Sequence, residues 1–323
     1  MSNTQSKKNV LVTGGAGFIG SNLVASLLND KRVNKVRVID NLSNGYVENL
    51  KEFSSNNRFE FIKGDIRDIE TCRNVCEGMD LITHQAALGS VSRSIENPML
   101  TTEVNILGTV NIMYAAVENK IERVVLAFSS STYGDHKKLP KIEDVVGNPL
   151  SPYAVTKSSI EHFAYVFGKI YGLKWIGLRY FNVFGPKQNP KNPYAAVIPI
   201  FCDAFINNTN ININGDGLTS RDFTYVDNAI HMNLLSLFTE NKKALNKIYN
   251  TACNQRISLN ELVSSLEKIF NKKQVVNFRS ERPGDVKHSL ASITKAKNLL
   301  GYSPIVSFHN GLQKTVSWYL NEG

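Results

Sequence analysis

Cysteine is scarce in this chain of 323 residues, and the few cysteines fall into no pattern that binds a metal or builds a disulfide framework. The four are Cys72, Cys76, Cys202 and Cys253. They include no C-x-x-C pair and stand near no histidine at ligand spacing. Such usage is typical of a reduced compartment. We therefore expect a cytoplasmic protein with no metal site.

Long apolar runs are also missing. The chain has no stretch of about 18 apolar residues, which predicts that no segment crosses a membrane. The opening letters MSNTQSKKN contain nothing like the apolar core of a secretory signal. Both absences favour the cytoplasm and exclude a membrane partner from the prediction.

Positive charge is in excess, but it is not concentrated. The formal net charge is +9, yet the lysines are spread along the chain in pairs such as Lys7-Lys8 and Lys242-Lys243. A protein that binds nucleic acid gathers its charge in one patch or stripe, so we expect no nucleic-acid partner. A surplus of this sign also suits an anionic small substrate.

What the chain does have is a regular alternation of strands and helices over its first half. Apolar runs predict strands at residues 9–13, 35–40, 59–65, 81–87, 123–130 and 173–180. Helical segments fall between them, at about 18–29, 68–77, 97–119 and 152–171. This alternation is typical of the α/β class with a doubly wound parallel sheet. Ligands of such sheets bind at the carboxyl ends of the strands.

The pattern changes after about residue 183, where FGPKQNPKNP contains three prolines and predicts a loop. A helix near 195–207 and short strands around 211–214 and 222–226 follow. Residues 247–252 predict a strand that returns to the main sheet. We expect one domain over residues 1–182, with return segments near 226–252, and a smaller, interleaved C-terminal lobe over 183–323.

A glycine-rich turn, TGGAGFIG at residues 13–20, joins the first strand to the first helix. Gly14 allows the tight turn, Gly17 lets backbone approach a pyrophosphate, and Gly20 allows the helix to pack closely on the sheet. The helix N-terminus adds N–H donors and positive potential. These features predict a dinucleotide-binding Rossmann domain, against the alternative of a turn that is merely rich in glycine.

The end of the second strand indicates which dinucleotide is bound. Asp40 stands 20 residues after Gly20 and can accept hydrogen bonds from both hydroxyls of the adenosine ribose. Its charge repels the extra phosphate of NADP, and no arginine stands beside it. We therefore predict NAD as the cofactor. Candidates for further contacts at the ends of the third and fourth strands are Asp65, Ile66, Ala86 and Ala87.

The stretch SPYAVTK at residues 151–157 opens a predicted helix. Ser151 suits the N-cap and Pro152 the first helical position, so Tyr153 and Lys157 lie one turn apart on one face. The preceding strand ends in SSSTYGD, residues 129–135, at the same edge of the sheet. Taken alone, such a pair is more often a half-buried tyrosine packed on a lysine stem. Beside the serines and the glycine turn, it indicates a catalytic centre.

In that interpretation the Lys157 ammonium lowers the pKa of Tyr153, and the positive ring of the cofactor adds to the effect. Moving a tyrosine from its ordinary pKa to neutrality takes about 4 kcal/mol. Tyr153 then acts as a general base for a substrate hydroxyl. Ser129, Ser130 and Ser131 are the candidates to orient the proton. Strand alternation puts Ser129 and Ser131 on one side, and a bulge would bring in Ser130.

Together these motifs resemble the extended short-chain dehydrogenase/reductases over essentially the whole chain. The glycine turn, Asp40, SSSTYGD, YAVTK and LRYFNVFG (178–185) carry that resemblance. Four further stretches are most similar to bacterial UDP-N-acetylglucosamine 4-epimerases: HQAALGSV (84–91), YAAVIP (194–199), GDGLTSRDF (215–223) and RPGDVKHSL (282–290).

The resemblance implies a reaction. UDP-GlcNAc and UDP-GalNAc are interconverted through a transient 4-keto sugar, as surface polysaccharide synthesis requires. Tyr153 takes the C4 hydroxyl proton while hydride passes to NAD⁺, the sugar swings about its diphosphate, and hydride returns to the opposite face. NAD⁺ is regenerated in each cycle and stays bound.

The resemblance also implies site residues. The implied cofactor contacts are Gly14, Gly17, Phe18, Ile19, Gly20, Asp40, Asn41, Ser43, Gly45, Asp65, Ile66, Gln85, Ala86, Ala87, Asn105, Tyr153, Lys157, Tyr180 and Val183. The implied substrate contacts are Gly89, Ser90, Ser130, Asn182, Gln188, Ala196, Val197, Arg221, Phe223, Arg282, Asp285 and Ser289. Arg221 and Arg282 would grip the diphosphate, as guanidinium forks do well. Ser289 stands where epimerases restricted to non-acetylated sugars carry a tyrosine that fills the space of the acetyl group.

The residues leave alternatives open. The substrate could be a UDP-N-acetylhexosaminuronic acid, whose carboxylate Arg93 or a nearby lysine could pair, or UDP-glucose and UDP-galactose. A 4,6-dehydratase of the same fold needs an Asp-Glu pair where this chain has Ser130 and Ser131. A catalytically silent NAD-binding regulator would tend to lose the Ser/Tyr/Lys set. Apolar faces of the helices near 100–118 and 152–170 exceed what one sheet covers, and the resemblance implies that they pair in a homodimer.

Overall fold

A computed structural model describes residues 6–280 and 287–321. Its centre is a parallel sheet of seven strands in the order β11-β6-β5-β4-β1-β2-β3. The strands are β1 (Lys8–Thr13), β2 (Val33–Asp40), β3 (Phe59–Lys63), β4 (Leu81–His84), β5 (Arg123–Ser129), β6 (Trp175–Tyr180) and β11 (Lys247–Thr251). This confirms the predicted α/β class and the return of the 247–252 segment to the main sheet.

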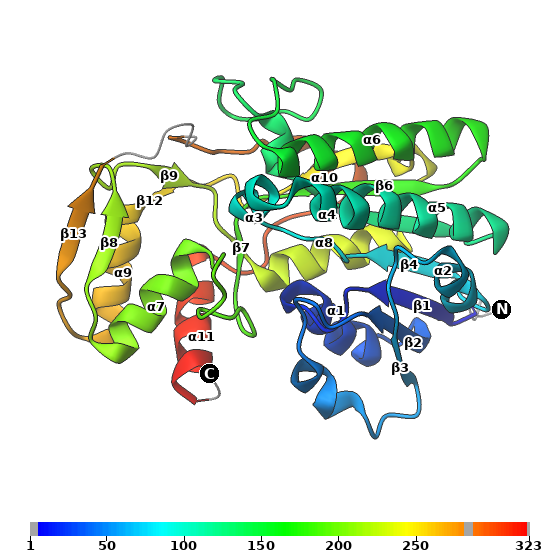
Figure 1. Cartoon of the computed structure of the whole chain (residues 1–323), viewed down its shortest axis with the longest axis horizontal. Helices are drawn as coiled ribbons and strands as arrows, with labels where there is room; N and C mark the ends of the chain where they lie inside the picture. The colour runs from blue at the N-terminus through cyan, green and yellow to red at the C-terminus, as the bar shows by residue number, and fades with distance from the viewer. Residues whose placement is uncertain (1–5, 281–286, 322–323) are drawn as a thin grey trace.

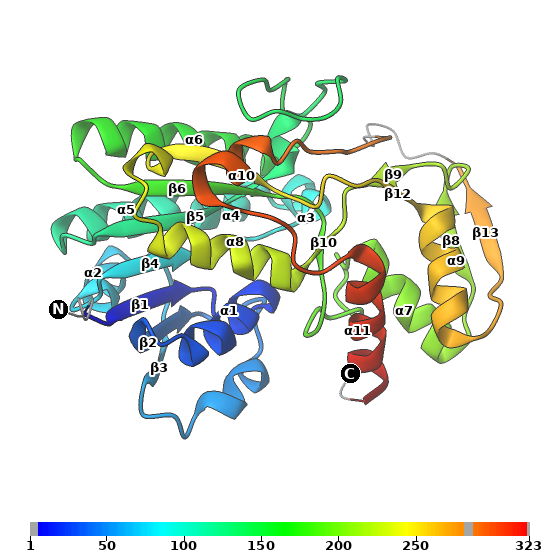
Figure 2. The same ribbon diagram turned by 180° about the vertical axis from the view of Figure 1, so that it is seen from behind.

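Helices cover both faces of the sheet because alternate strand residues point to opposite sides and are apolar on both (Figures 1 and 2). Leu11 and Ile39 face one layer, made of α2 (Ile69–Cys76), α5 (Gly108–Glu118) and α6 (Pro152–Ile170). Val10 and Val38 face the other, made of α1 (Phe18–Asn29), α8 (Val226–Phe238) and α10 (Thr294–Leu300). Within the part of the chain described, no helix is long and apolar enough to span a membrane.

The predicted helix over 97–119 is confirmed from Pro98 to Glu118, and it contains one π-helical turn. It runs without a break through α4 (Pro98–Thr102), the π turn η2 (Glu103–Leu107) and α5, and the short helix α3 (Val91–Glu96) precedes it. Asn97 caps α4 through the backbone N–H of Leu100 at 3.0 Å, with Pro98 at the first position. In the π turn, the buried Asn105 side chain is hydrogen-bonded outside the helix, to Leu88 and Thr156. The prediction of one helix was correct, and only the π turn around Asn105 was not foreseen.

The smaller lobe is built from short sheets and helices around its own aromatic core of Phe184, Phe223 and Phe308. Its strands are β7 (Val183–Phe184), β8 (Ile211–Asn214), β9 (Ser220–Arg221), β10 (Thr224–Tyr225), β12 (Ile257–Ser258) and β13 (Val276–Arg279), and its helices are α7 (Val197–Asn207), α9 (Leu259–Phe270) and α11 (Phe308–Asn321). Three short 3-10 turns complete the fold: η1 (Val47–Phe53), η3 (Ser130–Tyr133) and η4 (Lys242–Ala244). The predicted strand at 222–226 is shorter than expected, since α8 begins at Val226.

The lobe is interleaved with the sheet, because α8, β11 and α10 leave it and pack on the main domain (Figure 2). That matches the expected architecture. A boundary at residues 182/183 stays a prediction.

Candidate active site

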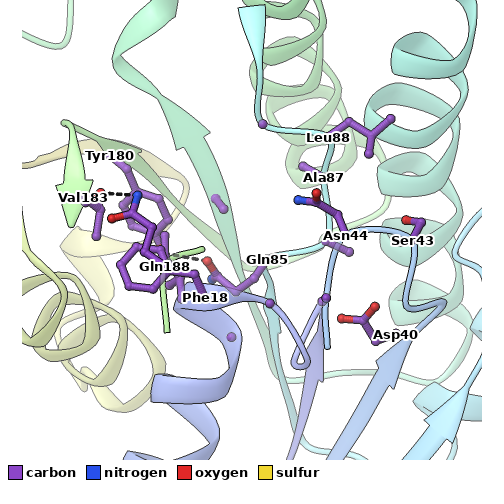
Figure 3. Close-up of a pocket in the computed structure, with 18 of the residues that line it drawn as sticks. Phe18, Asp40, Ser43, Asn44, Gln85, Ala87, Leu88, Tyr180, Val183 and Gln188 are labelled. Carbon is purple, nitrogen blue, oxygen red and sulfur yellow. Dashed lines mark hydrogen bonds between the residues drawn. The ribbon is translucent and has the colours of Figure 1, made fainter. Parts of the chain in front are cut away.

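A cleft of about 510 Å³ opens at the carboxyl ends of the strands, where parallel α/β sheets bind ligands. Six strands of the main sheet contribute to it, through Gly14 after β1, Asp40 of β2, Gly64 after β3, Gln85 after β4, Ser129 of β5 and Tyr180 of β6. Figure 3 shows Asp40 and Ser43 toward one end of the cleft and Tyr180, Val183 and Gln188 toward the other. The volume is in the range of small-molecule sites.

The glycine turn fits a dinucleotide by its backbone. Gly14 has a φ of +68°, and a Cβ there would lie 2.7 Å from the backbone of Ala86. A Cβ on Gly20 would lie 2.1 Å from the carbonyl oxygen of Gly14, so α1 packs against the turn only because that position is glycine. Gly17 is the N-cap of α1, and no side chain caps its first turn. The helix therefore presents backbone N–H donors to an anion in the cleft.

Asp40 ends β2 and is 9% exposed. Its carboxylate accepts hydrogen bonds from the backbone N–H groups of Ala16 at 3.0 Å and Leu42 at 2.8 Å. Burial raises the pKa of Asp40, and these two bonds oppose the rise. The carboxylate thus lies fixed beside the glycine turn, where a ribose diol of the dinucleotide would meet it.

Tyr153 and Lys157 lie on α6, which begins as the sequence predicts. The Ser151 hydroxyl accepts from the N–H of Ala154 at 3.1 Å, with Pro152 at the first helical position. Lys157 Nζ donates to the carbonyl of Ala127 at 2.8 Å and lies 5.9 Å from the centre of the Tyr153 ring. Both side chains line the cleft.

The electrostatics differ from the prediction in one respect. Burial raises the pKa of Tyr153, and a hydrogen bond with Ser129 offsets part of the rise. Burial lowers the pKa of Lys157 to about 8, against a smaller opposing effect of the Glu161 charge. The net effect of the protein groups on the pKa of Tyr153 is thus a rise, whereas the sequence predicts that Lys157 lowers it. The protein groups therefore leave the phenol protonated at neutral pH.

The end of β5 determines which serines of the triplet line the cleft. Ser129 is the last strand residue, and its hydroxyl accepts from the N–H of Ser131 at 3.1 Å. The 3-10 turn η3 begins at Ser130 and breaks the strand alternation that would have paired Ser129 with Ser131. Ser129 and Ser130 line the cleft, whereas Ser131 does not.

Most of the predicted site residues meet in this one cleft. Those that line it are Gly14, Gly17, Phe18, Ile19, Gly20, Asp40, Asn41, Ser43, Gly45, Ile66, Gln85, Ala86, Ala87, Gly89, Ser129, Ser130, Tyr153, Lys157, Tyr180, Asn182, Val183, Gln188 and Ala196. Described residues that do not line it are Asp65, Ser90, Asn105, Ser131, Val197, Arg221, Phe223 and Ser289. Arg282 and Asp285 lie outside the described residues.

The residues outside the cleft have other contacts. Asp65 is paired with Arg67, which lowers the pKa of its carboxyl to about 2. The Ser90 hydroxyl caps α3. Phe223 is 4% exposed and stacks on Phe308 in the core of the lobe, so its ring does not reach the cleft.

Asn105 supports the site from behind. Its Oδ1 accepts from the N–H of Leu88 at 2.8 Å, and its Nδ2 donates to the carbonyl of Leu88 and to the hydroxyl of Thr156. It thereby joins the loop after β4 to the first turns of α6. The sequence predicted a cofactor contact, and the structure shows a bond between two walls of the cleft.

One polar network was not predicted. Asn233 of α8, fully buried, donates to the hydroxyl of Tyr180 at 2.7 Å and accepts from Gln85 Nε2 at 3.2 Å and from the hydroxyl of Thr83 at 3.1 Å. The Tyr180 hydroxyl in turn donates to Gln85 Oε1 at 3.0 Å (Figure 3). These bonds fix two side chains of the cleft. No motif signals Asn233, because its partner Thr83 is 150 residues away in sequence.

A further unpredicted feature is a strap, residues 186–194, that follows β7 and is hydrogen-bonded across the cleft to the segment after β2. The bonds are Lys187 Nζ to Glu52 at 2.7 Å, Asn189 Nδ2 to the Tyr46 hydroxyl at 2.7 Å and Asn192 Nδ2 to Asn44 Oδ1 at 3.1 Å. Arg93 of α3 also donates to Asn44 and lies 4.6 Å from the Tyr194 ring centre. The strap ties the two sides of the cleft together.

Comparison with known proteins decides the family. Residues 11–315 match the family model described as GDP-mannose 4,6 dehydratase. The chain belongs to this family of extended short-chain dehydrogenase/reductases. The putative UDP-glucose 4-epimerase of Methanocaldococcus jannaschii is 35% identical to it, over 97% of this chain and 98% of that protein.

Two solved structures are similar in both sequence and fold. The UDP-N-acetylglucosamine 4-epimerase of Methanobrevibacter ruminantium, in complex with UDP-N-acetylmuramic acid, is 38% identical with a TM-score of 0.92, over 99% of this chain and 100% of that one. The UDP-glucuronic acid 4-epimerase of Bacillus cereus, in complex with UDP-glucuronic acid and NAD, is 33% identical with a TM-score of 0.89, over 96% and 98%. This member of the family is an NAD-dependent isomerase, which confirms the predicted enzyme class and cofactor.

Proposed function

We propose that this enzyme inverts the C4 configuration of UDP-linked N-acetylhexosamines, interconverting UDP-GlcNAc and UDP-GalNAc. The observation that carries the proposal is that Tyr153, Lys157 and Ser129 line the same cleft as the glycine turn and Asp40. Bound NAD supplies a hydride acceptor that is reversible, as an inversion through a ketone requires. A sugar whose C4 hydroxyl lies beside Tyr153 could then lose the hydroxyl proton to the protein and hydride from C4 to the cofactor in one place.

Tyr153, Ser129 and Lys157 have separate roles in the proton transfer. Tyr153 receives the C4 hydroxyl proton as a general base and returns it in the second half of the reaction. Ser129 orients that proton through its hydrogen bond with the phenol. Lys157, held on the Ala127 carbonyl, contributes a positive charge close to the ring. Because burial raises the pKa of Tyr153, its deprotonation depends on the additional positive charge of the oxidised cofactor.

The sugar end of the cleft supports the acetylated class. Gly89 lines it, and a Cβ there would have no atom within 4 Å, so this wall is open. Asn182 lines it too, and its Nδ2 lies 3.5 Å from the Ser289 hydroxyl immediately behind. A serine occupies the space that a tyrosine ring would fill. Arg221 is proposed to bind the diphosphate from the neighbouring strand β9.

The test uses purified enzyme without added NAD, incubated separately with UDP-GlcNAc, UDP-glucose and UDP-GlcNAcA, with the C4 epimers resolved by chromatography or NMR. We expect epimerisation of UDP-GlcNAc at the highest kcat/KM. Tyr153→Phe is the matched control, since it removes one oxygen and leaves the ring; it is expected to abolish turnover while the protein retains its NAD. Epimerisation that survived this change would refute the assignment.

The acetyl pocket has its own test. Ser289→Tyr is expected to abolish turnover of UDP-GlcNAc and spare UDP-glucose, because the ring takes the space of the acetyl group. Ser289→Ala, which keeps the space, is the control and is expected to retain UDP-GlcNAc turnover. Unchanged turnover of the acetylated sugar by the tyrosine variant would show that the pocket is elsewhere.

A second candidate is C4 inversion of uronic acids, which the similarity to a UDP-glucuronic acid 4-epimerase favours. The cation proposed to pair with a C6 carboxylate is Arg93. It borders a smaller cavity beside the cleft, where it is hydrogen-bonded to Asn44 and stacked on Tyr194. Turnover of UDP-GlcNAcA that is lost in Arg93→Met, with UDP-GlcNAc turnover retained, would establish this activity.

A further inference from the structure

Asp222 is a buried carboxylate that neither the glycine turn nor the Tyr-Lys pair explains. It lies between β9 and β10, is fully buried, and does not line the cleft. Its Oδ1 accepts from the backbone N–H of Cys253 at 2.9 Å, and its Oδ2 accepts from the backbone N–H of Ala291 at 3.1 Å. One side chain therefore binds two segments that are far from it in sequence.

These two segments come from different parts of the fold. Cys253 follows β11, the edge strand of the main sheet. Ala291 forms a bridge with Lys141, in the loop between η3 and α6 of the main domain. Asp222 itself belongs to the smaller lobe. Its carboxylate thus joins the lobe to the main domain where the chain passes behind the sugar end of the cleft.

The segment that Asp222 holds carries Ser289. The N–H of Ser289 donates to the carbonyl of Ser220 at 3.0 Å, and its hydroxyl accepts from the N–H of Asp222 at 3.2 Å. Asn182 Nδ2 donates to the carbonyl of Asp222 at 3.1 Å and lies 3.5 Å from the Ser289 hydroxyl. The backbone of Asp222 therefore contacts both Ser289 and Asn182, and its carboxylate holds the same segment at Ala291, two residues after Ser289.

We propose that Asp222 is a positioning residue that fixes the spacing of Ser289 and Asn182, and that this spacing determines the choice between acetylated and non-acetylated sugars. The inference rests on the proposed function. Asp222 acts through its neighbours, because its own carboxylate is turned away from the cleft toward backbone N–H groups. A sugar without an acetyl group does not need this space, so its turnover should not depend on the position of Ser289.

Asp222→Asn isolates the effect. The side chain keeps its shape, but one carboxylate oxygen becomes an NH₂ group that cannot accept a hydrogen bond, so one buried N–H of Cys253 or Ala291 loses its partner. Such a loss costs about 1–3 kcal/mol, which is enough to release the segment locally. Ser289 keeps its bonds to Ser220 and to the backbone N–H of Asp222, but the segment loses its attachment at Ala291, two residues further on, so the room for the acetyl group is expected to be less sharply defined.

The experiment measures kcat and KM of the holoenzyme for UDP-GlcNAc and for UDP-glucose. We expect Asp222→Asn to raise KM for UDP-GlcNAc. The ratio of kcat/KM for UDP-GlcNAc to kcat/KM for UDP-glucose is expected to fall about tenfold, with the NAD content unchanged. Gln274→Ala is the control. Gln274 lies in the turn between α9 and β13 and donates to the backbone carbonyls of Ala204 and Thr209, so this variant loses stability without touching Ser289.

The outcomes separate the two hypotheses. An unchanged ratio in Asp222→Asn, or an equal fall of the ratio in Gln274→Ala, overturns the positioning role. Should Asp222→Asn fail to fold, Asp222→Glu keeps the charge but moves the acceptors by one methylene; its ratio is expected to fall, and an unchanged ratio again overturns the inference. A wild-type enzyme that epimerises neither UDP-GlcNAc nor UDP-glucose refutes the proposed function instead.

Discussion

Among single residues, burial of the Lys157 charge lowers the free energy of unfolding. Burial lowers its pKa to about 8, whereas an unfolded chain titrates its lysines near 10.4. Below pH 8 Lys157 is charged in both the folded and the unfolded chain, so this loss of stability is fully present. As pH rises from 8 toward 10.4 the unfolded chain binds more protons than the folded one, so the loss disappears.

Lys157→Met is therefore expected to raise the free energy of unfolding of the NAD-free protein at pH 7, by at most about 3 kcal/mol, while abolishing turnover. The gain is expected to shrink at pH 9.5. Urea unfolding at the two pH values measures both. Lys169→Met, an exposed lysine on the same helix, is the control and is expected to show no such dependence. A gain that is independent of pH would show that burial of the Lys157 charge is not its cause.

Residues whose partners are close in sequence, or whose backbone position is dictated by a motif, were predictable. Gly14, Asp40, Tyr153 and Lys157 all lie in the cleft, as expected. Asp222 and Asn233 were not foreseen, because their partners are tens to more than a hundred residues away. The raised pKa of Tyr153 was also missed, since no sequence pattern shows how deeply the phenol is buried.

At the scale of elements, the N-terminus of α6 connects stability with the position of the catalytic side chains. Ser151→Ala removes the cap on the N–H of Ala154 and is expected to cost about 1 kcal/mol of folding free energy. Because Tyr153 lies in that first turn, kcat is expected to fall several-fold while KM changes little. Ser159→Ala, which removes an exposed hydroxyl farther along the same helix, is the control for thermal unfolding and kinetics.

Elements with clear local signals were predicted closely, and those bounded by tertiary contacts were not. The helix at 18–29 was expected with the bounds that α1 has, because a glycine turn precedes it. The strand predicted at 81–87 stops at His84, since its neighbour β1 ends at Thr13 and the chain turns at Gly14. The π turn within the 97–119 helix lies where Asn105 is hydrogen-bonded to Leu88 and Thr156, and no periodicity contains that signal.

At the scale of the whole molecule, α6 presents an apolar face to solvent. Val155, Phe163, Val166 and Ile170 are between 39% and 71% exposed, and Tyr114 of the adjacent α5 is 39% exposed. Side chains of this kind on two neighbouring helices form a surface that a second copy could cover. We propose that two chains pair through α5 and α6.

Phe163→Glu is expected to convert that dimer into a monomer, because it would bury two unpaired carboxylates at the interface. Analytical ultracentrifugation of the holoenzyme measures the mass. Val275→Glu changes an apolar side chain with 60% exposure on the smaller lobe and is expected to leave the mass unchanged. A wild-type protein that sediments as a monomer would contradict the proposed dimer.

The strap of residues 186–194 has a consequence for how the enzyme is assembled. Its hydrogen bonds to Asn44, Tyr46 and Glu52 would have to open before a molecule as long as a dinucleotide could leave the cleft. We therefore expect bound NAD to exchange more slowly than the enzyme turns over. One dinucleotide would then serve many cycles, and catalysis would depend little on the balance of oxidised and reduced coenzyme around the enzyme.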